Sequence, residues 1–204
     1  MKVLLINGSP RKNGNTFLAL SEIARTLETE GIASEIMWIG HKPVRGCIVC
    51  GQCKTKGNGA CAFDDDVCNA ISAKFADSDG IIVGSPVYYG QPNGALLAVL
   101  QRTLYSNSSA ICDKPAAAVA ICRRGGATAA LQTLLMPFQI LNMPIVTSQY
   151  WNIAYGREEG QAAQDAEGMQ TMRTLAHNMA RMIRGLHNEP VPEREARQAT
   201  HFIR

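Results

Sequence analysis

The feature that most constrains the fold is the N-terminal stretch KVLLINGSPRKNGNT, which spans residues 2–16. An apolar run leads directly into a loop rich in Gly, Ser, Asn and Thr, and a helical pattern follows. In such a turn the backbone N–H groups point into one concavity, and the positive end of the next helix lies behind them. Ser9, Asn15 and Thr16 add side-chain donors, and Arg11 adds a positive charge. The sequence therefore predicts a phosphate-binding loop between a strand and a helix.

Neither of the two common nucleotide-binding patterns fits this loop. From Gly8 the spacing is GxxxxxGNT with no lysine after Gly14, which is not a P-loop, and the chain has no GxGxxG. The loop is therefore expected to hold a different kind of phosphate compound.

Short apolar runs alternate with helical patterns along the whole chain, which predicts an α/β fold with a parallel sheet and helices on both faces. The predicted strands are residues 2–6, 34–38, 80–85, 116–122 and 144–148, each bounded by Gly, Pro, Asp or Asn. The methionine-rich segment 162–185 has the spacing of a helix that packs on a core. For five strands we expect three layers and the doubly wound, flavodoxin-like order 2-1-3-4-5. Residues 1–185 would form this domain and residues 186–204 a C-terminal tail.

Two later segments have the same loop character as the first: GSPVYYGQPNG at residues 84–94 and RRGGAT at residues 123–128. Together with Gly8 to Thr16, which follows the pattern GSxRxxGNT, they resemble the three flavin-binding loops of the NADPH-dependent FMN reductases, a flavodoxin-like family. The resemblance implies FMN as cofactor and NAD(P)H as co-substrate. It implies a flavin oxidoreductase whose acceptor is a quinone, a nitro compound, a free flavin or a protein. The cofactor-binding residues that it implies are Ser9, Arg11, Asn15, Thr16, Pro86, Val87, Tyr88, Tyr89, Gly90, Arg123, Arg124, Gly125 and Gly126.

The first and third predicted strands border the switch point of the sheet, so their loops are expected to flank one crevice at its carboxyl edge. Tyr88 and Tyr89 would offer aromatic surface to the flavin ring; the alternative is a buried aromatic anchor between loop and helix. Arg123 and Arg124 would meet the flavin O2 edge or a nicotinamide phosphate, or else form a solvated pair. No side-chain catalyst is expected, because the flavin carries the chemistry.

Four of the seven cysteines lie within fifteen residues, at Cys47, Cys50, Cys53 and Cys61, with the spacing CxxCxxCx7C. This segment resembles the compact cysteine motif of the iron-sulfur flavoproteins, a branch of the same family, which implies a 4Fe-4S cluster on these four thiolates. Four-thiolate zinc is an alternative, although it usually uses two separated CxxC pairs. A loop of free thiols is another, because cluster-free relatives keep a similar segment followed by an aspartate-rich turn. Because the segment follows the second strand, we expect it one or two strand spacings from the flavin crevice.

Composition limits the function classes further. The net charge of +3 is mild and its basic residues are scattered, which speaks against nucleic acid, and no stretch reaches the length of a membrane span. No secretory signal is visible, and the cysteine usage suits a reducing compartment, so we expect a cytoplasmic protein. Aromatic residues in 149–156 and the closing HFIR favour a homodimer or homotetramer. The functional alternatives are an iron-sulfur flavoprotein that relays electrons from ferredoxin, and a non-enzymatic redox carrier or sensor.

Overall fold

The computed structural model describes residues 1–196, 198 and 200, and the closing HFIR lies outside the described residues. Five parallel strands form the sheet in the order β2-β1-β3-β5-β6. They are β1 (Lys2–Asn7), β2 (Ala33–Trp38), β3 (Gly80–Tyr88), β5 (Ala116–Cys122) and β6 (Ile153–Tyr155). A two-residue strand, β4 (Gln91–Pro92), turns back antiparallel on the end of β3. Counted without β4, this is the predicted flavodoxin-like order.

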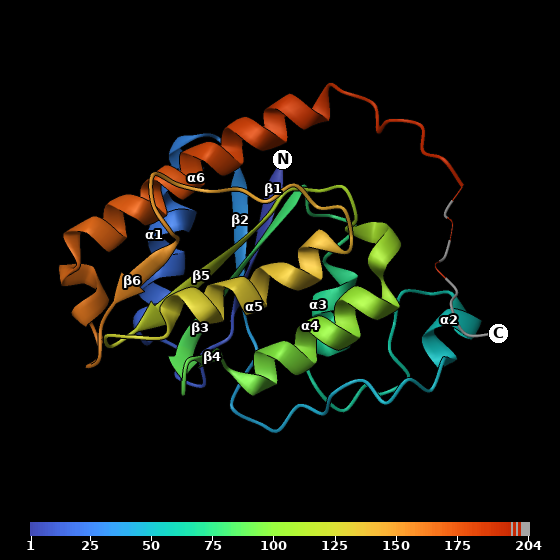
Figure 1. The fold of residues 1–204 in the computed structure, drawn as a ribbon, viewed down its shortest axis with the longest axis horizontal. Coiled ribbons are helices and arrows are strands. Elements are labelled where there is room, and N and C mark those ends of the chain that lie inside the picture. The colour runs from blue at the N-terminus through green and yellow to red at the C-terminus, as the bar shows by residue number, and fades with distance from the viewer. Residues whose placement is uncertain (197, 199, 201–204) are drawn as a thin grey trace.

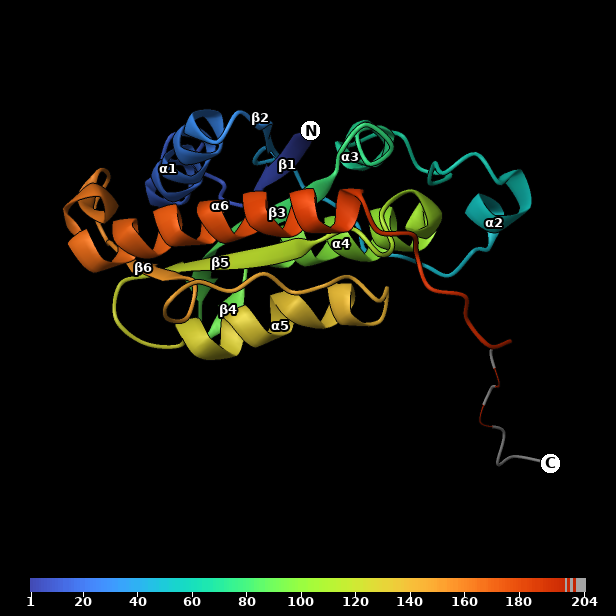
Figure 2. The ribbon, with the colours of Figure 1, turned by 90° about the horizontal axis from the view of Figure 1, so that it is seen from above.

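Helices cover both faces of the sheet, as predicted. One face carries α1 (Asn15–Thr29) and α6 (Ala166–His187), and the other carries α3 (Cys68–Ala73), α4 (Gly94–Ser106) and α5 (Ala127–Gln139). In Figure 2, α5 runs along one side of β5 and α6 along the other. Each face has its own apolar core, and the methionine stripe of α6 is buried in the core that it shares with α1. The remaining elements are the short helix α2 (Gln52–Lys56) and the 3-10 turns η1 (Ser108–Ala110) and η2 (Gln161–Gln164).

The predicted fifth strand at residues 144–148 is wrong. That segment makes one isolated bridge, between Ile145 and Ala116, and the true edge strand is Ile153–Tyr155. The carbonyl of Pro144 accepts from the N–H of Ala116. Pro144 has no N–H of its own with which to continue the ladder, and the chain then leaves the sheet edge. The apolar residues of the run are used for packing, since Val146 is buried in the core under α6.

The long connection from β2 to α3 departs most from a compact βα loop. In Figure 1 it leaves the end of β2, passes along the side of the molecule near α4 and reaches α2 at the far edge. Within the described residues, no helix has the length and apolar character needed to cross a membrane.

Candidate functional site

The first loop is held in shape by the buried side chain of Asn7, the last residue of β1. The Asn7 amide donates to the carbonyl of Lys12 (3.0 Å) and its oxygen accepts from the N–H of Ser9 (3.1 Å). The Ser9 hydroxyl in turn accepts from the N–H of Arg11 (3.1 Å). Helix α1 then begins at Asn15 with Gly14 as its N-cap and no side chain capping it. The loop therefore ends on a 15-residue helix whose first N–H groups have no side-chain acceptor.

The four side chains predicted to bind phosphate differ in what they already contact. Ser9 and Thr16 are buried in the loop, and Arg11 is exposed at its rim. The Asn15 amide is engaged by a distant segment: it donates to the Glu158 carbonyl (2.9 Å) and accepts from an N–H in η2 (3.2 Å). Asn15 therefore ties the loop to the segment before α6. Because its side chain is occupied by these contacts, only its backbone N–H is available at the N-terminus of α1.

The first loop and the β3 loop are joined by direct hydrogen bonds. The N–H of Gly8 donates to the carbonyl of Gly84 (2.8 Å), and the Asn93 amide donates to the carbonyl of Gly8 (2.7 Å). Asn93 also accepts from the N–H of Ala95 as the N-cap of α4, while its own N–H donates to Ser85 (2.9 Å). The two predicted loops are therefore one structure at the switch point between β1 and β3.

The third predicted loop reaches the second through two glycines. Gly126, at φ 87°, lies so close to Gly90 that a Cβ built on it would be 2.7 Å from the Gly90 Cα. Pro86, Val87 and Tyr88 are the last residues of β3, and Tyr89 and Gly90 form the tight turn to β4; Tyr88 and Tyr89 are exposed, and Tyr89 has a φ of 50°. The buried-anchor alternative for the tyrosines therefore does not hold. Arg123, Arg124 and Gly125 are exposed where β5 ends, next to this contact.

Sequence reasoning missed several residues that complete the site. The indole N–H of Trp38, at the end of β2, donates to the carbonyl of Ser9 (2.7 Å). The N–H of Gly156, just after β6, donates to the carbonyl of Cys122 (3.0 Å), which brings that segment beside the third loop. For Asn93 a signal existed, since Asn is a preferred N-cap residue before a helix. No such signal pointed to Trp38 or Gly156, because their hydrogen-bond partners lie far away in the sequence.

The four clustered cysteines line one small concavity. It is lined by Cys47, Cys50, Cys53 and Cys61 together with residues of α4 and the cysteine segment; these are Ile48, Gly51, Ala62, Phe63, Arg102, Tyr105 and Ser106. All seven cysteines are free, and of these four only Cys53 is buried. Within the described part of the chain, no three His, Cys, Asp or Glu side chains stand close enough together to hold a metal ion. The four cysteines therefore border one concavity without converging on a single point.

The concavity lies farther from the three joined loops than the sequence suggested. Its residues Arg102, Tyr105 and Ser106 belong to the C-terminal half of α4, whereas Asn93 at the other end of the helix contacts the loop after β1. Arg102 follows Asn93 by nine residues, so a rise of about 1.5 Å each puts them about 14 Å apart along the axis. The predicted distance of one or two strand spacings was wrong, because the long connection runs away from the sheet edge before the cysteines occur.

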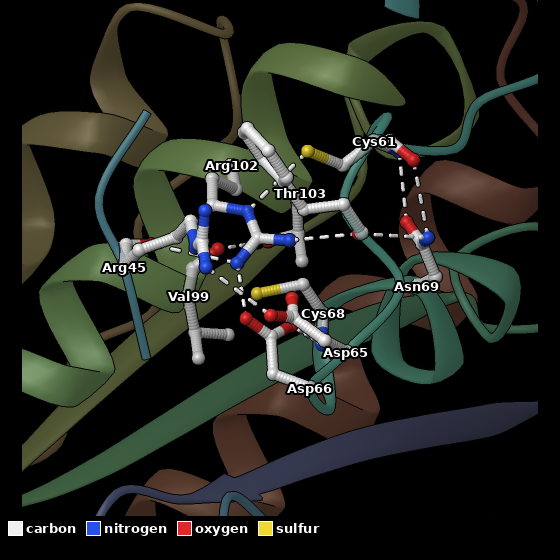
Figure 3. Close-up of polar contacts among 10 residues, drawn as sticks. Arg45, Cys61, Asp65, Asp66, Cys68, Asn69, Val99, Arg102 and Thr103 are labelled. Atoms are coloured by element: carbon white, nitrogen blue, oxygen red, sulfur yellow. Dashed lines mark hydrogen bonds and ion pairs between the residues drawn. The ribbon is translucent and has the colours of Figure 1, made fainter. Parts of the chain in front are cut away.

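Arg102 holds the cysteine segment onto α4 (Figure 3). Its guanidinium group is fully buried and pairs with the carboxylate of Asp66. It also donates to the carbonyls of Phe63 (2.9 Å) and Arg45 (3.4 Å), and its Nε donates to the Cys61 sulfur (3.3 Å). One arginine thus contacts four residues of the connection between β2 and α3, namely Arg45, Cys61, Phe63 and Asp66.

This network shifts the pKa of three groups. Burial raises the pKa of Asp66, but the hydrogen bonds from Cys68 and Arg102 outweigh it and hold the pKa below its usual value. Burial and the neighbouring Asp66 carboxylate raise the pKa of the Cys68 thiol to about 12. Burial opposes the charge of Arg102, yet its hydrogen bond to Asp66 keeps the pKa of the guanidinium raised. Cys68 is therefore a neutral thiol, and the Asp66 and Arg102 pair stays charged.

Cys68, Cys112 and Cys122 are separate from the concavity. They lie in α3, after η1 and at the end of β5, as the sequence predicted. Cys68 and Cys122 are buried, and Cys112 is partly exposed. Because these three thiols lie outside the concavity, a substitution of one of them can serve as a control for substitutions of the four clustered cysteines.

The family model of the NADPH-dependent FMN reductases matches residues 1–158 of this chain. An iron-sulfur flavoprotein of Methanocaldococcus jannaschii is 33% identical over 192 residues, covering 90% of this chain and 98% of the relative. An iron-sulfur flavoprotein of Methanosarcina thermophila is 29% identical over 189 residues, covering 90% and 95%.

Solved structures share the fold at low sequence identity. RosB with a bound 8-demethyl-8-formylriboflavin-5'-phosphate superimposes with a TM-score of 0.73 at 17% identity, covering 94% of this chain and 82% of RosB. A flavodoxin from the domain Archaea has a TM-score of 0.61 at 13% identity, covering 90% and 99%. The joined loops, the sheet order and these matches lead to one conclusion: this flavodoxin-like chain belongs to the NADPH-dependent FMN reductase family of flavin oxidoreductases.

Proposed function

We propose that the protein binds FMN across its three joined loops and transfers electrons from NAD(P)H to a quinone, flavin or similar acceptor. The observation that carries this proposal is the direct contact of loops from β1, β3 and β5 at one sheet edge. The residues fit the cofactor: the loop after β1 ends at a helix terminus without a capping side chain, and the glycines let the other two loops meet.

The residues of the three loops have distinct tasks in this proposal. The hydroxyls of Ser9 and Thr16 and the first N–H groups of α1 bind the phosphate, and Arg11 supplies the counter-charge. Tyr88 and Tyr89 offer exposed aromatic surface at the ring position. Arg123 and Arg124 lie free at the rim for the ring edge or a nicotinamide phosphate. Bound FMN supplies the hydride and electron chemistry.

The phosphate assignment is tested by titrating the apoprotein with FMN and with riboflavin. FMN should bind far more tightly, and Ser9→Ala or Thr16→Ala should each weaken FMN by about 1–3 kcal/mol for a lost charge-assisted bond. Ser109→Ala, an exposed serine in the 3-10 turn η1 that follows α4, is the matched control. Equal affinity for the two flavins would rule out a phosphate role for this loop.

NAD(P)H as the donor is tested by anaerobic mixing with the flavin-loaded protein. Bleaching of the flavin absorption by NADH or NADPH would support the proposal. The description of the matching family, NADPH-dependent FMN reductase, favours this outcome. Bleaching by reduced ferredoxin alone would point instead to an electron relay. Absence of turnover with any acceptor after flavin reduction would favour a carrier or sensor.

A second function is favoured by the cysteine concavity. We propose that Cys47, Cys50, Cys53 and Cys61 hold a 4Fe-4S cluster and that the protein exchanges single electrons through it. Four free cysteines around one concavity provide the donor set that such clusters take. Glycines at positive φ before and after α2, Gly51 and Gly57, give the segment backbone freedom to gather the thiols. The names of the relatives, iron-sulfur flavoproteins, point the same way.

Metal analysis of anaerobically purified protein tests the cluster. Iron and sulfide should accompany the flavin, and Cys50→Ala or Cys53→Ala should remove the iron while Cys112→Ala leaves it. Four-thiolate zinc would give zinc without sulfide. Protein with full flavin and no metal would leave a segment of free thiols.

A further inference from the structure

Arg102 is the one described arginine whose side chain is fully buried, and it sits on the helix that connects the two proposed redox regions. Most of the other buried residues of α4 are apolar, including Val99, Leu100 and Leu104, and the only other polar ones are the hydroxyl residues Thr103 and Ser106. A buried guanidinium group is costly unless its charge and its N–H groups are all satisfied. The groups that contact Arg102 therefore indicate the role of this buried arginine.

Three of its four contacts secure the fold of the cysteine segment. The Asp66 carboxylate balances the charge, and the carbonyls of Arg45 and Phe63 fasten the connection on both sides of the cysteines. The fourth contact is different, because Nε donates to the Cys61 sulfur at 3.3 Å. Cys61 has a second anchor in Asn69, which accepts from its N–H (2.8 Å) and donates to its carbonyl (3.1 Å).

The backbone of Cys61 is thus fixed by Asn69 and its sulfur by Arg102, as Figure 3 shows. Cys61 is also the thiol farthest along the chain from the other three, across the seven-residue gap. A ligand at the end of a long gap is the one that most needs to be held in place, because closing the gap costs conformational entropy.

We propose that Arg102 is the positioning residue for Cys61, holding its sulfur toward the concavity shared with Cys47, Cys50 and Cys53 and donating a hydrogen bond to it. This inference rests on the proposed cluster. A hydrogen bond donated to a ligating sulfur stabilises the more negative reduced state of such a centre. Arg102 therefore keeps the fourth ligand in place and raises the reduction potential.

The test uses the full chain, purified anaerobically with its flavin and iron, and the variant Arg102→Lys. Lysine keeps the charge opposite Asp66 but has no planar fork to reach Cys61 and two carbonyls at once. Arg45→Lys is the matched control, because Arg45 is an exposed arginine of the same segment that pairs with Asp65. The readouts are the midpoint potential of the iron-sulfur signal, the rate of iron loss to a chelator, and the flavin content.

For Arg102→Lys we expect a tenfold shift toward the oxidised centre at a given potential, which is about 59 mV for a one-electron couple. Iron loss should be roughly tenfold faster or more, with unchanged flavin content and an unchanged Arg45→Lys control. If Arg102→Lys loses flavin as well, the double variant Arg102→Gln, Asp66→Asn replaces the ion pair with neutral amides. It is expected to shift both readouts in the same direction.

Wild-type potential and iron loss in a flavin-loaded Arg102 variant would overturn the positioning role while leaving the cluster intact. Wild-type protein with full flavin and no iron would overturn the cluster, and the positioning role with it. The two failures are therefore distinguishable in one set of preparations.

Discussion

At the residue scale, the structure is organised by single polar side chains that satisfy several distant groups at once. Asn7 shapes the loop after β1, Asn93 joins it to β3 and caps α4, and Arg102 fastens the cysteine segment. Each is at least partly buried, so removing one leaves its partners without hydrogen bonds in a poorly solvated place. We expect these three residues, more than the exposed loop side chains, to determine whether the two proposed sites form.

The ion pair of Asp66 and Arg102 should make stability depend on acid. The pKa of Asp66 is lowered in the folded state, so its contribution is fully present above the unfolded pKa of about 3.9. It is lost as the pH falls below that value and through the lower folded pKa. We predict that Asp66→Asn is less stable than wild type by about 3–5 kcal/mol at pH 7, because it leaves Arg102 unpaired.

Urea unfolding at a series of pH values down to about pH 3 measures this, since the Asp66→Asn curve should be flatter than the wild-type curve there. Asp65→Asn, whose side chain is 60% exposed, is the control and should follow the wild type. Parallel curves for all three proteins would contradict a role for Asp66 ionisation.

At the element scale, the sheet edge is built by loops whose close contacts require glycine or an N-cap residue. Gly126 permits contact with Gly90, and Gly8 lies where a Cβ would be 2.5 Å from Leu96 of α4. Because α4 begins in this contact and ends at the cysteine concavity, it is the element that both proposed sites share.

We predict that Gly126→Ala weakens both folding and FMN binding. Alanine at a positive φ costs about 1–2 kcal/mol, and its Cβ would overlap Gly90 and push the second and third loops apart. Gly31→Ala is the matched control, because Gly31 also has a positive φ (70°) but nothing lies within 4 Å of its Cβ. Unfolding free energies and FMN dissociation constants check this, and equal effects of the two substitutions would contradict the loop contact.

Asn93→Ala should loosen the junction of the first two loops. Loss of the N-cap of α4 is expected to lower the unfolding free energy by about 0.5–2 kcal/mol. FMN affinity should fall with it, because the Gly8 carbonyl loses its donor. The exposed Asn188→Ala, just past α6, is expected to change neither quantity. An Asn93→Ala protein with lower stability but wild-type FMN affinity would show that the cap does not organise the phosphate loop.

At the scale of the whole molecule, several apolar side chains remain exposed. Ile48 and Val49 lie on the cysteine segment, and Tyr150, Trp151 and Tyr155 lie around β6. We propose that these surfaces take part in a homodimer or homotetramer, since clustered exposed apolar groups mark association sites. Light scattering of the wild type and of Trp151→Ser would test this, and a wild-type monomer would refute it.

The arrangement of the three loops predicts the kinetic mechanism. A cofactor held in one crevice exposes one usable ring face, so NAD(P)H and the acceptor should occupy the same pocket in turn. Steady-state rates at varied NAD(P)H and quinone concentrations should then give parallel double-reciprocal lines. Tyr88→Ala should alter turnover, whereas Arg11→Ala should mainly alter FMN retention. Intersecting lines would mean that both substrates bind together.

Local pattern was sufficient to predict the layers and four of the five parallel strands. The strand, loop and helix in residues 2–29 and the buried strand AAAVAIC are recognisable because period, turn residues and apolar runs reflect neighbours in the chain. The same holds for α6, whose methionine stripe is buried as predicted. The parallel order of the sheet then follows from handedness and connectivity.

What the sequence alone determined was thus the layers, the sheet order and which loops reach the carboxyl edge. Tertiary structure decided the rest. It made Ile153–Tyr155 the edge strand, because any short apolar run can form a strand and only the folded sheet determines which run lies beside a partner strand. It buried Arg102, which its charge would place on the surface, and so set where the cysteines lie. The reason is that these outcomes depend on contacts between residues far apart in the chain, whose energies no local pattern contains.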